Sequence, residues 1–98
     1  MKIAKSVSEK ITFKDQGDRF HAREFSAFRE ITIPDNSLQE AIRFHEVELD
    51  MDLRKQVLTN FLLEGVITAD HMQRTLDPYK QLLEAADKAL SDVLNGTE

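Results

Sequence analysis

Residues 46–53, with the sequence EVELDMDL, decide the fold, because their pattern suits two kinds of secondary structure. Acidic and apolar residues alternate without exception, which is typical of a strand with one buried face. Two observations favour a helix: no Gly or Pro interrupts this part of the chain, and helical spacing resumes between Leu53 and Phe61. We therefore expect a long or kinked helix over residues 35–65, with a short strand at residues 46–53 as the alternative.

The N-terminal third, residues 1–34, predicts a long antiparallel β-hairpin. Polar and apolar residues alternate from Met1 to Lys14, and a second run rich in Phe, Ile and Thr covers residues 19–33. Between the two runs lies Asp15–Asp18, which has the composition of a turn. We expect Gly17 to adopt the positive φ that such turns require.

The apolar residues of the second run change parity along the chain. Near the start of the run they are Phe20 and Ala22, and the later set has the opposite parity: Phe25, Ala27, Ile31 and Ile33. An extra residue or a local twist in this strand would bring both sets to one face, so we expect a bulge or twist near Arg23-Glu24.

The remaining boundaries are marked by residues that favour helix ends. Ser37 and Glu40 have the spacing of a capping box, and Gly65 suits the position just after a helix. Thr68 suits the N-cap of a following helix, and Pro78, preceded by an Asp, suits the first turn of a third. The sequence therefore predicts an α+β fold, with the hairpin followed by two or three helices (ββααα).

The C-terminal part, residues 68–95, carries the clearest amphipathic pattern. Its apolar residues recur at helical spacing, and they are Tyr79, Leu82, Leu83, Ala86, Leu90 and Val93. The 98 residues suit a single domain made of the hairpin (1–34), the long helix (35–65) and this helical part.

Charge is distributed unevenly along the chain, whose formal net charge is −5. Residues 1–33 contain seven Lys/Arg and five Asp/Glu, whereas residues 34–98 contain six and thirteen. The acidic majority argues against non-specific nucleic-acid binding by the whole molecule, because phosphate binding needs concentrated positive charge. The chain has no Cys and no apolar run long enough to cross a membrane, so we expect a small acidic protein of the cytoplasm.

Catalytic and metal-binding motifs are absent from the sequence. The three histidines, His21, His45 and His71, lie 24 and 26 residues apart, without the spacing that places two ligands on one helix face. Three glycines cannot build a phosphate-binding loop, and no Ser lies in a nucleophile-elbow pattern. We therefore predict a protein that is not an enzyme and that needs no metal or cofactor.

Two resemblances bear on the origin of the chain. The segment from Leu58 to Leu83, centred on Gly65-Val66-Ile67-Thr68, resembles the SHOCT module, in which two helices meet at a Gly-Ile-Ile-Thr-like turn; it departs from that family after Thr68, where ADHM replaces an acidic-aromatic run. The SHOCT resemblance implies a role in oligomerisation. The basic hairpin and the helix that follows, residues 1–41, are similar in outline to small phage accessory proteins, which implies a mobile-element origin.

Protein–protein association is the function that these observations favour. A long helix whose apolar stripe changes direction needs more than one neighbour, so we expect a homodimer or higher oligomer. The predicted role is an oligomerising accessory protein, or a small inhibitor or adaptor of a larger protein. The candidate interface residues are Val57, Leu58, Phe61 and Leu62.

The alternative function is a nucleic-acid-binding regulator that uses the basic hairpin. A two-stranded ribbon can enter a major groove, where cationic side chains contact phosphates and bases. The candidate contacts are Lys10, Lys14, Arg19, His21 and Arg23.

Overall fold

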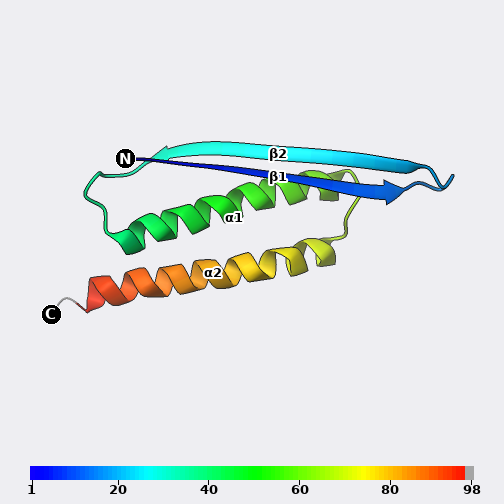
Figure 1. Cartoon of the computed structure of the whole chain (residues 1–98). Helices are drawn as coiled ribbons and strands as arrows, with labels where there is room; N and C mark the ends of the chain where they lie inside the picture. Colours follow the sequence, from blue (N-terminus) through cyan, green and yellow to red (C-terminus); the bar gives the residue numbers. More distant parts are fainter. Residues whose placement is uncertain (97–98) are drawn as a thin grey trace.

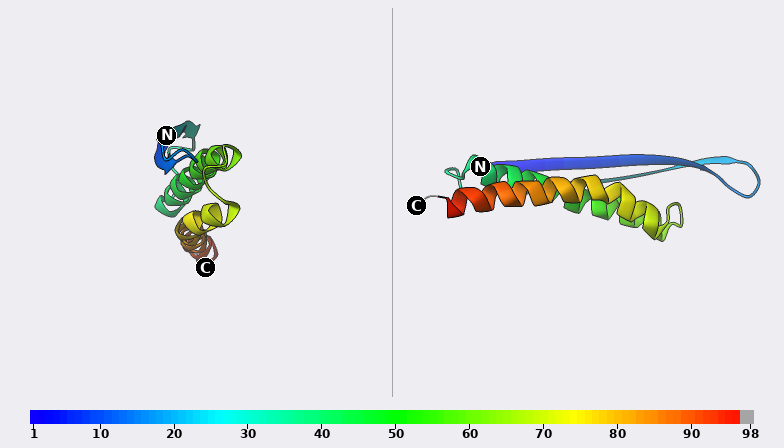
Figure 2. Two further views of the ribbon diagram at one scale, coloured as in Figure 1. Left: turned by 90° about the vertical axis from the view of Figure 1, so that its right-hand side faces the viewer. Right: turned by 90° about the horizontal axis from the view of Figure 1, so that it is seen from below.

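Two long strands and two long helices make up the computed structural model, which describes residues 1–96. Strand β1 spans Lys2–Lys14, β2 spans Phe20–Thr32, helix α1 spans Gln39–Leu63 and α2 spans Ala69–Asn95. Figures 1 and 2 show three layers, with the hairpin on one side of α1 and α2 on the other. The predicted α+β class, a hairpin followed by helices, is confirmed.

The molecule is elongated, with extents of 65 × 25 × 15 Å and a radius of gyration of 17.2 Å. A compact chain of about 100 residues has a radius of gyration of about 13 Å. Strand length explains the difference, because thirteen residues at about 3.3 Å each extend further than the 25 residues of α1 at about 1.5 Å each. The hairpin tip therefore projects beyond the helices (Figure 1).

The two strands pair without interruption, from Lys2 opposite Thr32 to Lys14 opposite Phe20. The predicted bulge near Arg23-Glu24 is therefore wrong. Its premise was that both apolar sets of β2 need one buried face. The start of β2 lies at the projecting tip, and Phe20 remains 71% exposed on the outer face.

The tip is a tight turn in which Asp18, and not Gly17, has the positive φ, at 59°. The Asp15 carbonyl accepts a hydrogen bond from the Asp18 N–H at 3.2 Å, and the Asp15 N–H donates to the Arg19 carbonyl at 2.9 Å. A type I turn followed by a left-handed residue is the common three-residue hairpin loop. Asp is among the few residues that tolerate this conformation, so the positive φ does not require the glycine.

Helix α1 runs without a break through residues 46–53, which excludes the strand alternative. The four apolar residues of this stretch are all buried, and they are Val47, Leu49, Met51 and Leu53. Residues two apart lie on nearly opposite sides of a helix. Their joint burial therefore requires a neighbour on each side, and the hairpin and α2 are those neighbours. The alternating pattern is that of a middle-layer helix.

The two ends of α1 differ in how the sequence marks them. The predicted capping box does not form, because the Ser37 hydroxyl donates to the Pro34 carbonyl at 2.7 Å and Leu38 occupies the N-cap. At the C-terminal end Gly65 has φ 74°, and the Val66 N–H donates to the Phe61 carbonyl at 3.0 Å. This is the Schellman arrangement expected of a glycine after a helix.

Helix α2 begins where predicted, because the Thr68 hydroxyl accepts a hydrogen bond from the His71 N–H at 3.0 Å. The predicted boundary at Pro78 is wrong, since α2 continues through it, and residues 1–96 contain two helices, the lower of the two numbers predicted. Proline removes the hydrogen bond to the Arg74 carbonyl, and its ring crowds that carbonyl. Arg74 and Pro78 are both exposed, so water can bind that carbonyl, while packing of Leu76 holds the helix against α1.

The hydrophobic core lies between the hairpin and the helices and draws on all four elements. Its centre is three fully buried α1 side chains, Leu53, Val57 and Phe61. The Phe61 ring meets the Phe25 ring of β2 edge to face, with centroids 4.9 Å apart. Ile3 and Val7 of β1 complete the sheet side, and Leu76 contributes from α2.

Candidate association surface on the hairpin

The outer face of the hairpin is covered by neither helix. Even-numbered residues of both strands point to this face, and all of them are exposed. Its middle contains three serines and one large side chain, with Ser8 opposite Ser26 and Ser6 opposite Phe28. Phe28 is 67% exposed. We call the even-numbered residues of β1 and β2 the outer face and the odd-numbered residues the inner face.

Both edges of the sheet are also open, because the sheet has only two strands. The ladder ends with Asp15 donating to Arg19 and Ile33 donating to Met1, which shows that odd-numbered residues bond across the hairpin. In an antiparallel pair the backbone groups of alternate residues point to opposite sides of a strand. The N–H and C=O groups of the even-numbered residues therefore point away from the partner strand, to the free edges.

The five candidate nucleic-acid contacts do not form one basic surface. Lys10 and Lys14 lie on the outer face, whereas His21 and Arg23 lie on the inner face and Arg19 in the turn. Lys10 lies directly opposite Glu24, and the Lys14 Nζ lies 4.9 Å from the centroid of the Phe20 ring. Lys14 therefore contacts an aromatic ring of the hairpin, and Lys10 lies next to an acid.

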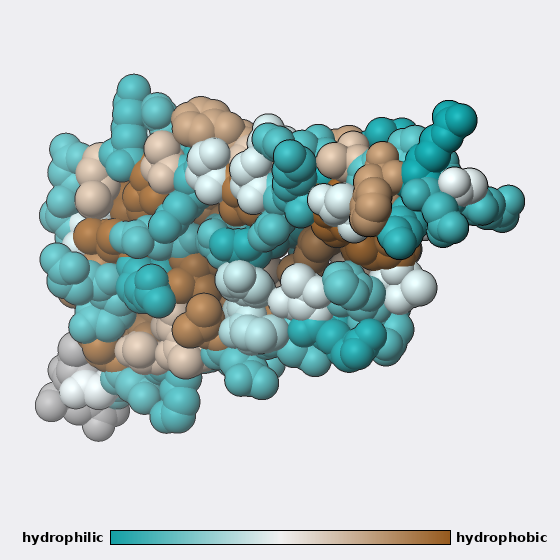
Figure 3. All heavy atoms as spheres, turned by 45° about the vertical axis from the view of Figure 1, so that its right-hand side comes forward, coloured by the Kyte–Doolittle hydropathy of each residue, from teal (hydrophilic) through white to brown (hydrophobic). Residues whose placement is uncertain are grey.

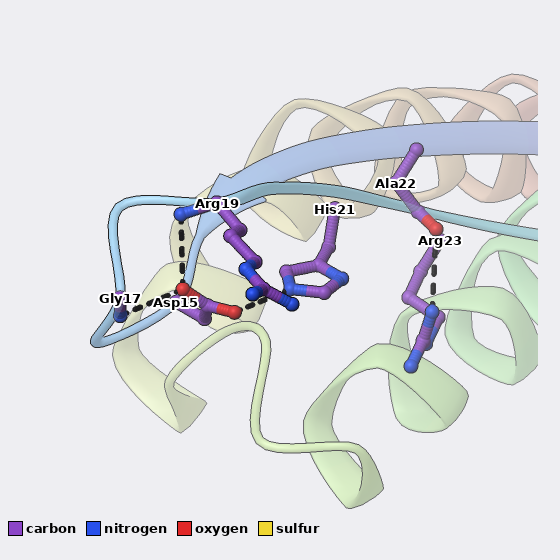
Figure 4. A network of polar contacts seen from close by, with 6 residues as sticks. All are labelled: Asp15, Gly17, Arg19, His21, Ala22 and Arg23. Carbon is purple, nitrogen blue, oxygen red and sulfur yellow. Dashed lines mark hydrogen bonds and ion pairs between the residues drawn. The ribbon is translucent and has the colours of Figure 1, made fainter.

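The turn gathers backbone donors and His21 around one carboxylate, that of Asp15 (Figure 4). Its oxygens accept hydrogen bonds from the N–H groups of Gly17 at 2.8 Å and Arg19 at 3.0 Å, and share one with His21 Nε2 at 2.7 Å. The bond with His21 is the largest cause that lowers the pKa of Asp15, and the Arg19 N–H follows. Because the folded state favours the charged carboxylate, its stabilising effect is present above the ordinary Asp pKa and is lost as the pH falls through the lowered one.

Arg23 is directed away from the tip and toward the helices (Figure 4). Its Nε lies 4.0 Å from the carboxylate of Glu64, at the end of α1. The next inner-face cation of β2, Arg29, likewise lies 3.9 Å from Asp52 of α1. Two cations of β2 are thus paired with acids at α1, which reduces the charge that they could offer to phosphates.

The candidate interface residues of α1 lie mostly inside the protomer. Val57 and Phe61 are fully buried and Leu58 is 5% exposed, whereas Leu62 is half-buried. The hairpin and α2 cover the first three side chains, so their apolar surface is not available to another molecule in this arrangement. The rotating stripe of α1 finds its second neighbour within the same chain.

Two inner-face residues outside the predicted sites, Lys5 and Glu9, bear more directly on association. Lys5 is half-buried and lies directly opposite Arg29, a like charge, and none of the ion pairs among residues 1–96 includes it. Glu9 contacts Arg54 of α1, with Oε1 and Nη1 3.2 Å apart. Arg54 also binds Asp50 at 2.9 Å. Both residues interrupt the apolar parity of β1, and this interruption was visible in the sequence.

A groove of about 420 Å³ lies under the tip, between the hairpin and the turn that joins the helices. Figure 3 shows hydrophobic side chains beneath the hairpin in this region. Its apolar lining is Ile11, Phe13, Val66 and Ile67, and its polar lining is Thr12, Thr68, His71 and Arg74. The groove is open and contains no carboxylate, so it has no acid–base pair.

Within residues 1–96, no group of three or more His, Cys, Asp or Glu side chains is placed to hold a metal ion. Neither α1 nor α2 contains an apolar stretch of the length that crossing a bilayer requires. Comparison of the chain with family models, with curated proteins and with solved structures gives no match.

Proposed function

We propose that this protein is a non-enzymatic association module, an oligomerising accessory protein that joins copies of itself through the hairpin. The observation that carries the proposal is the pair of thirteen-residue strands, each with one open edge and with an outer face that no other element covers. A two-stranded sheet is stabilised by packing on a helix or by further strands, and here α1 covers only the inner face and leaves both edges open.

The middle of the β1 edge supports the proposal, because its only protective device is the inward-pointing charge of Lys5, which a facing acid would neutralise. Natural edges are protected by proline, bulges or outward charges. Residues 4–8, with the sequence AKSVS, contain no proline and no bulge, and their outer-face members Ala4, Ser6 and Ser8 are small and uncharged. The outer-face lysines, which are Lys2, Lys10 and Lys14, lie outside this stretch.

The nucleic-acid alternative has less support. Binding to phosphates requires cations that are free to replace counterions. The candidate cations are divided between two faces, and most of them contact an acid or an aromatic ring of the same chain.

Light scattering across a range of protein concentrations, at low and high salt, tests the proposal. The monomer mass is 11.3 kDa, and we expect a mass that rises with concentration to a fixed multiple of it. The multiple should persist at high salt, because main-chain hydrogen bonds and buried apolar area are screened less than surface ion pairs. A mass of 11.3 kDa at every concentration would overturn the proposed function.

A further inference from the structure

We propose that two copies of this chain join along the free edges of their β1 strands, antiparallel and centred on Val7, to form one continuous four-stranded sheet. The partner is a second copy, and the proposal rests on the self-association proposed above. It specifies which of the two edges is used and in which register.

The backbone allows this register. In it Ser6 lies opposite Ser8 of the second copy, and Ala4 lies opposite Lys10 of the second copy. All four are even-numbered residues, whose N–H and C=O groups point to the free edge of β1. They can therefore form the hydrogen-bonded pairs of a new antiparallel ladder. In Figure 2 neither helix lies beside the outer edge of β1.

The inner-face side chains are complementary in the same register. Lys5 lies opposite Glu9 of the second copy, and by symmetry Glu9 lies opposite the second copy's Lys5. Ile3 lies opposite Ile11, and Val7 lies opposite itself. These are non-hydrogen-bonded pairs, in which the side chains approach most closely. Opposite charges and apolar partners at such positions each stabilise a sheet.

Lys5 gains the acid that its own chain does not provide. Within one copy it is half-buried and faces Arg29. In the dimer it would extend an existing row of alternating charges, in which Glu9 contacts Arg54 at 3.2 Å and Arg54 contacts Asp50 at 2.9 Å. The row would end on the second copy's ammonium group, and it would occur twice about the two-fold axis.

Neighbouring registers of the same edge are disfavoured by like charges. A shift of one residue brings inner-face side chains opposite outer-face ones, which breaks the parity of the sheet. Moving the centre to Ser6 places Lys2 opposite Lys10 of the second copy. Moving it to Ser8 places Lys2 opposite Lys14. Like charges directly opposite each other destabilise a strand pair.

The edge of β2 is less suited to self-pairing. A register centred on Ser26 places Arg23 opposite Arg29 of the second copy. A register centred on the next residue places Glu24 opposite Glu30. Two of the three central registers of β2 therefore bring like charges together, and the third, centred on Phe25, pairs no opposite charges. The Val7 register of β1 brings no like charges together and pairs Lys5 with Glu9 twice.

The helices can accept the dimer. A two-fold axis perpendicular to the sheet keeps both inner faces on the same side, so each α1 covers the two strands of its own chain. Two strands occupy about 10 Å, and a helix with its side chains is about 10–12 Å wide. The layer of helices would therefore match the widened sheet, and the outer face would form a continuous four-stranded surface.

A pair of proline substitutions tests which edge is used. Ser8 and Ser26 lie directly opposite each other, and the N–H of each points to its own free edge. Proline is tolerated at such edge positions because it removes no hydrogen bond within the hairpin. We expect Ser8→Pro to reduce the mass from twice 11.3 kDa to 11.3 kDa in light scattering, and Ser26→Pro, the matched control, to remain dimeric. Circular dichroism checks that both variants fold.

Cysteine substitutions test the register, and they remain informative if Ser8→Pro does not fold. The chain has no natural Cys, and both Ser6 and Ser8 are exposed. In the proposed register a mixture of Ser6→Cys and Ser8→Cys brings the two cysteines into one hydrogen-bonded pair, with Cα atoms about 5.5 Å apart, which a disulfide can span. Each variant alone leaves them about 7–8 Å apart on the diagonal. We expect covalent dimer to accumulate in the mixture and to be largely lost in the separate variants.

The outcomes distinguish the two proposals. A wild-type monomer at every concentration overturns both. An oligomer that persists in Ser8→Pro but dissociates in Ser26→Pro assigns the contact to β2. It overturns the pairing of β1 edges but not the proposed self-association. An oligomer that persists in both proline variants and dissociates in Phe28→Ser assigns the contact to the outer face. It likewise overturns only the pairing of β1 edges. Crosslinking that is fastest in Ser8→Cys alone moves the centre from Val7 to Ser8.

Discussion

The two helices of this protein differ in the number of neighbours that each has, and their sequences reflect that difference. The middle helix, α1, buries seven residues, whereas the outer helix, α2, buries two. Yet α2 has the clearer amphipathic stripe, and α1 distributes its apolar residues around the helix. A helix with one neighbour needs one apolar face, and a helix between two layers needs two. A clean stripe therefore identifies the less buried helix here.

The two apolar rows of α1 can be followed along the chain. Leu49, Leu53, Val57 and Phe61 recur every four residues and belong to the core that includes both strands. Val47 and Met51 are equally buried but lie outside that core. Since α1 packs against only the hairpin and α2 among the described elements, α2 is the neighbour that covers this second row.

The largest effect expected from this comparison is at the centre of α1. Phe61→Ala removes a side chain with no exposed surface and leaves a cavity against Phe25. We expect the free energy of unfolding, measured in urea by circular dichroism at low protein concentration, to fall by about 3–5 kcal/mol. Leu63→Ala, two residues away and 80% exposed, is the control and should change it by less than about 0.5 kcal/mol. Similar losses in both variants would contradict the middle-layer position of Phe61.

The outer helix should tolerate, and even gain from, removal of its proline. Pro78 lies inside α2 at an exposed position. Pro78→Ala restores the hydrogen bond to the Arg74 carbonyl, so we expect thermal and urea unfolding to show a gain of up to about 3 kcal/mol. Lys80→Ala, on the same helix, controls for the general effect of an added alanine. A loss of stability in Pro78→Ala would show that α2 depends on the shape that the proline gives it.

The N-termini of the two helices also differ, and we expect a smaller effect on the free energy of unfolding there. The Thr68 hydroxyl caps α2, whereas the Ser37 hydroxyl bonds to a carbonyl before α1 begins. Thr68→Ala should therefore lower the unfolding free energy by about 1 kcal/mol. Ser37→Ala should cost less, because no helical N–H loses its partner. Equal losses, measured side by side in urea, would mean that Ser37 also supports its helix.

The smallest loss of unfolding free energy is expected at Arg54, where the three layers meet. Its guanidinium lies 4.2 Å from the centroid of the Tyr79 ring of α2 and binds Glu9 of β1. We expect Arg54→Ala to destabilise the protein by about 0.5–1 kcal/mol through the lost cation–π contact and ion pairs. The control is Arg74→Ala, which removes an exposed pair with Asp70 within α2 and should cost less. The prediction fails if urea unfolding gives Arg54→Ala no larger loss than the control.

Local chemistry predicted the features whose causes are local. The hairpin follows from alternation and a turn, the end of α1 from Gly65, and the start of α2 from Thr68, since each depends on residues within one turn of the chain. One error arose where a distant contact decides, and another where two local partners compete for one side chain. Pro78 suits a helix start, but packing of α2 on α1 carries the helix through it. Ser37 suits a cap, but the preceding turn uses its hydroxyl.

The candidate site was predicted only in part, for a related reason. The parity of β1 indicated its two faces, and the interruptions at Lys5 and Glu9 were visible. The sequence gives no direct sign that Arg54 contacts Glu9 or that acids of α1 neutralise Arg23 and Arg29. Those partners lie 23 to 45 residues away, so only the register and the stacking of the layers bring them together.

The sequence by itself determined where the chain turns and which residues alternate, because turn, cap and strand preferences are properties of short segments. Only the tertiary structure decided that residues 46–53 are helical, since an alternating pattern in a helix is stabilised only when layers cover both of its sides. The same physical reason applies to the hairpin. Its alternation sets two faces, but burial of one of them by α1 determines which face remains exposed and which edges remain free.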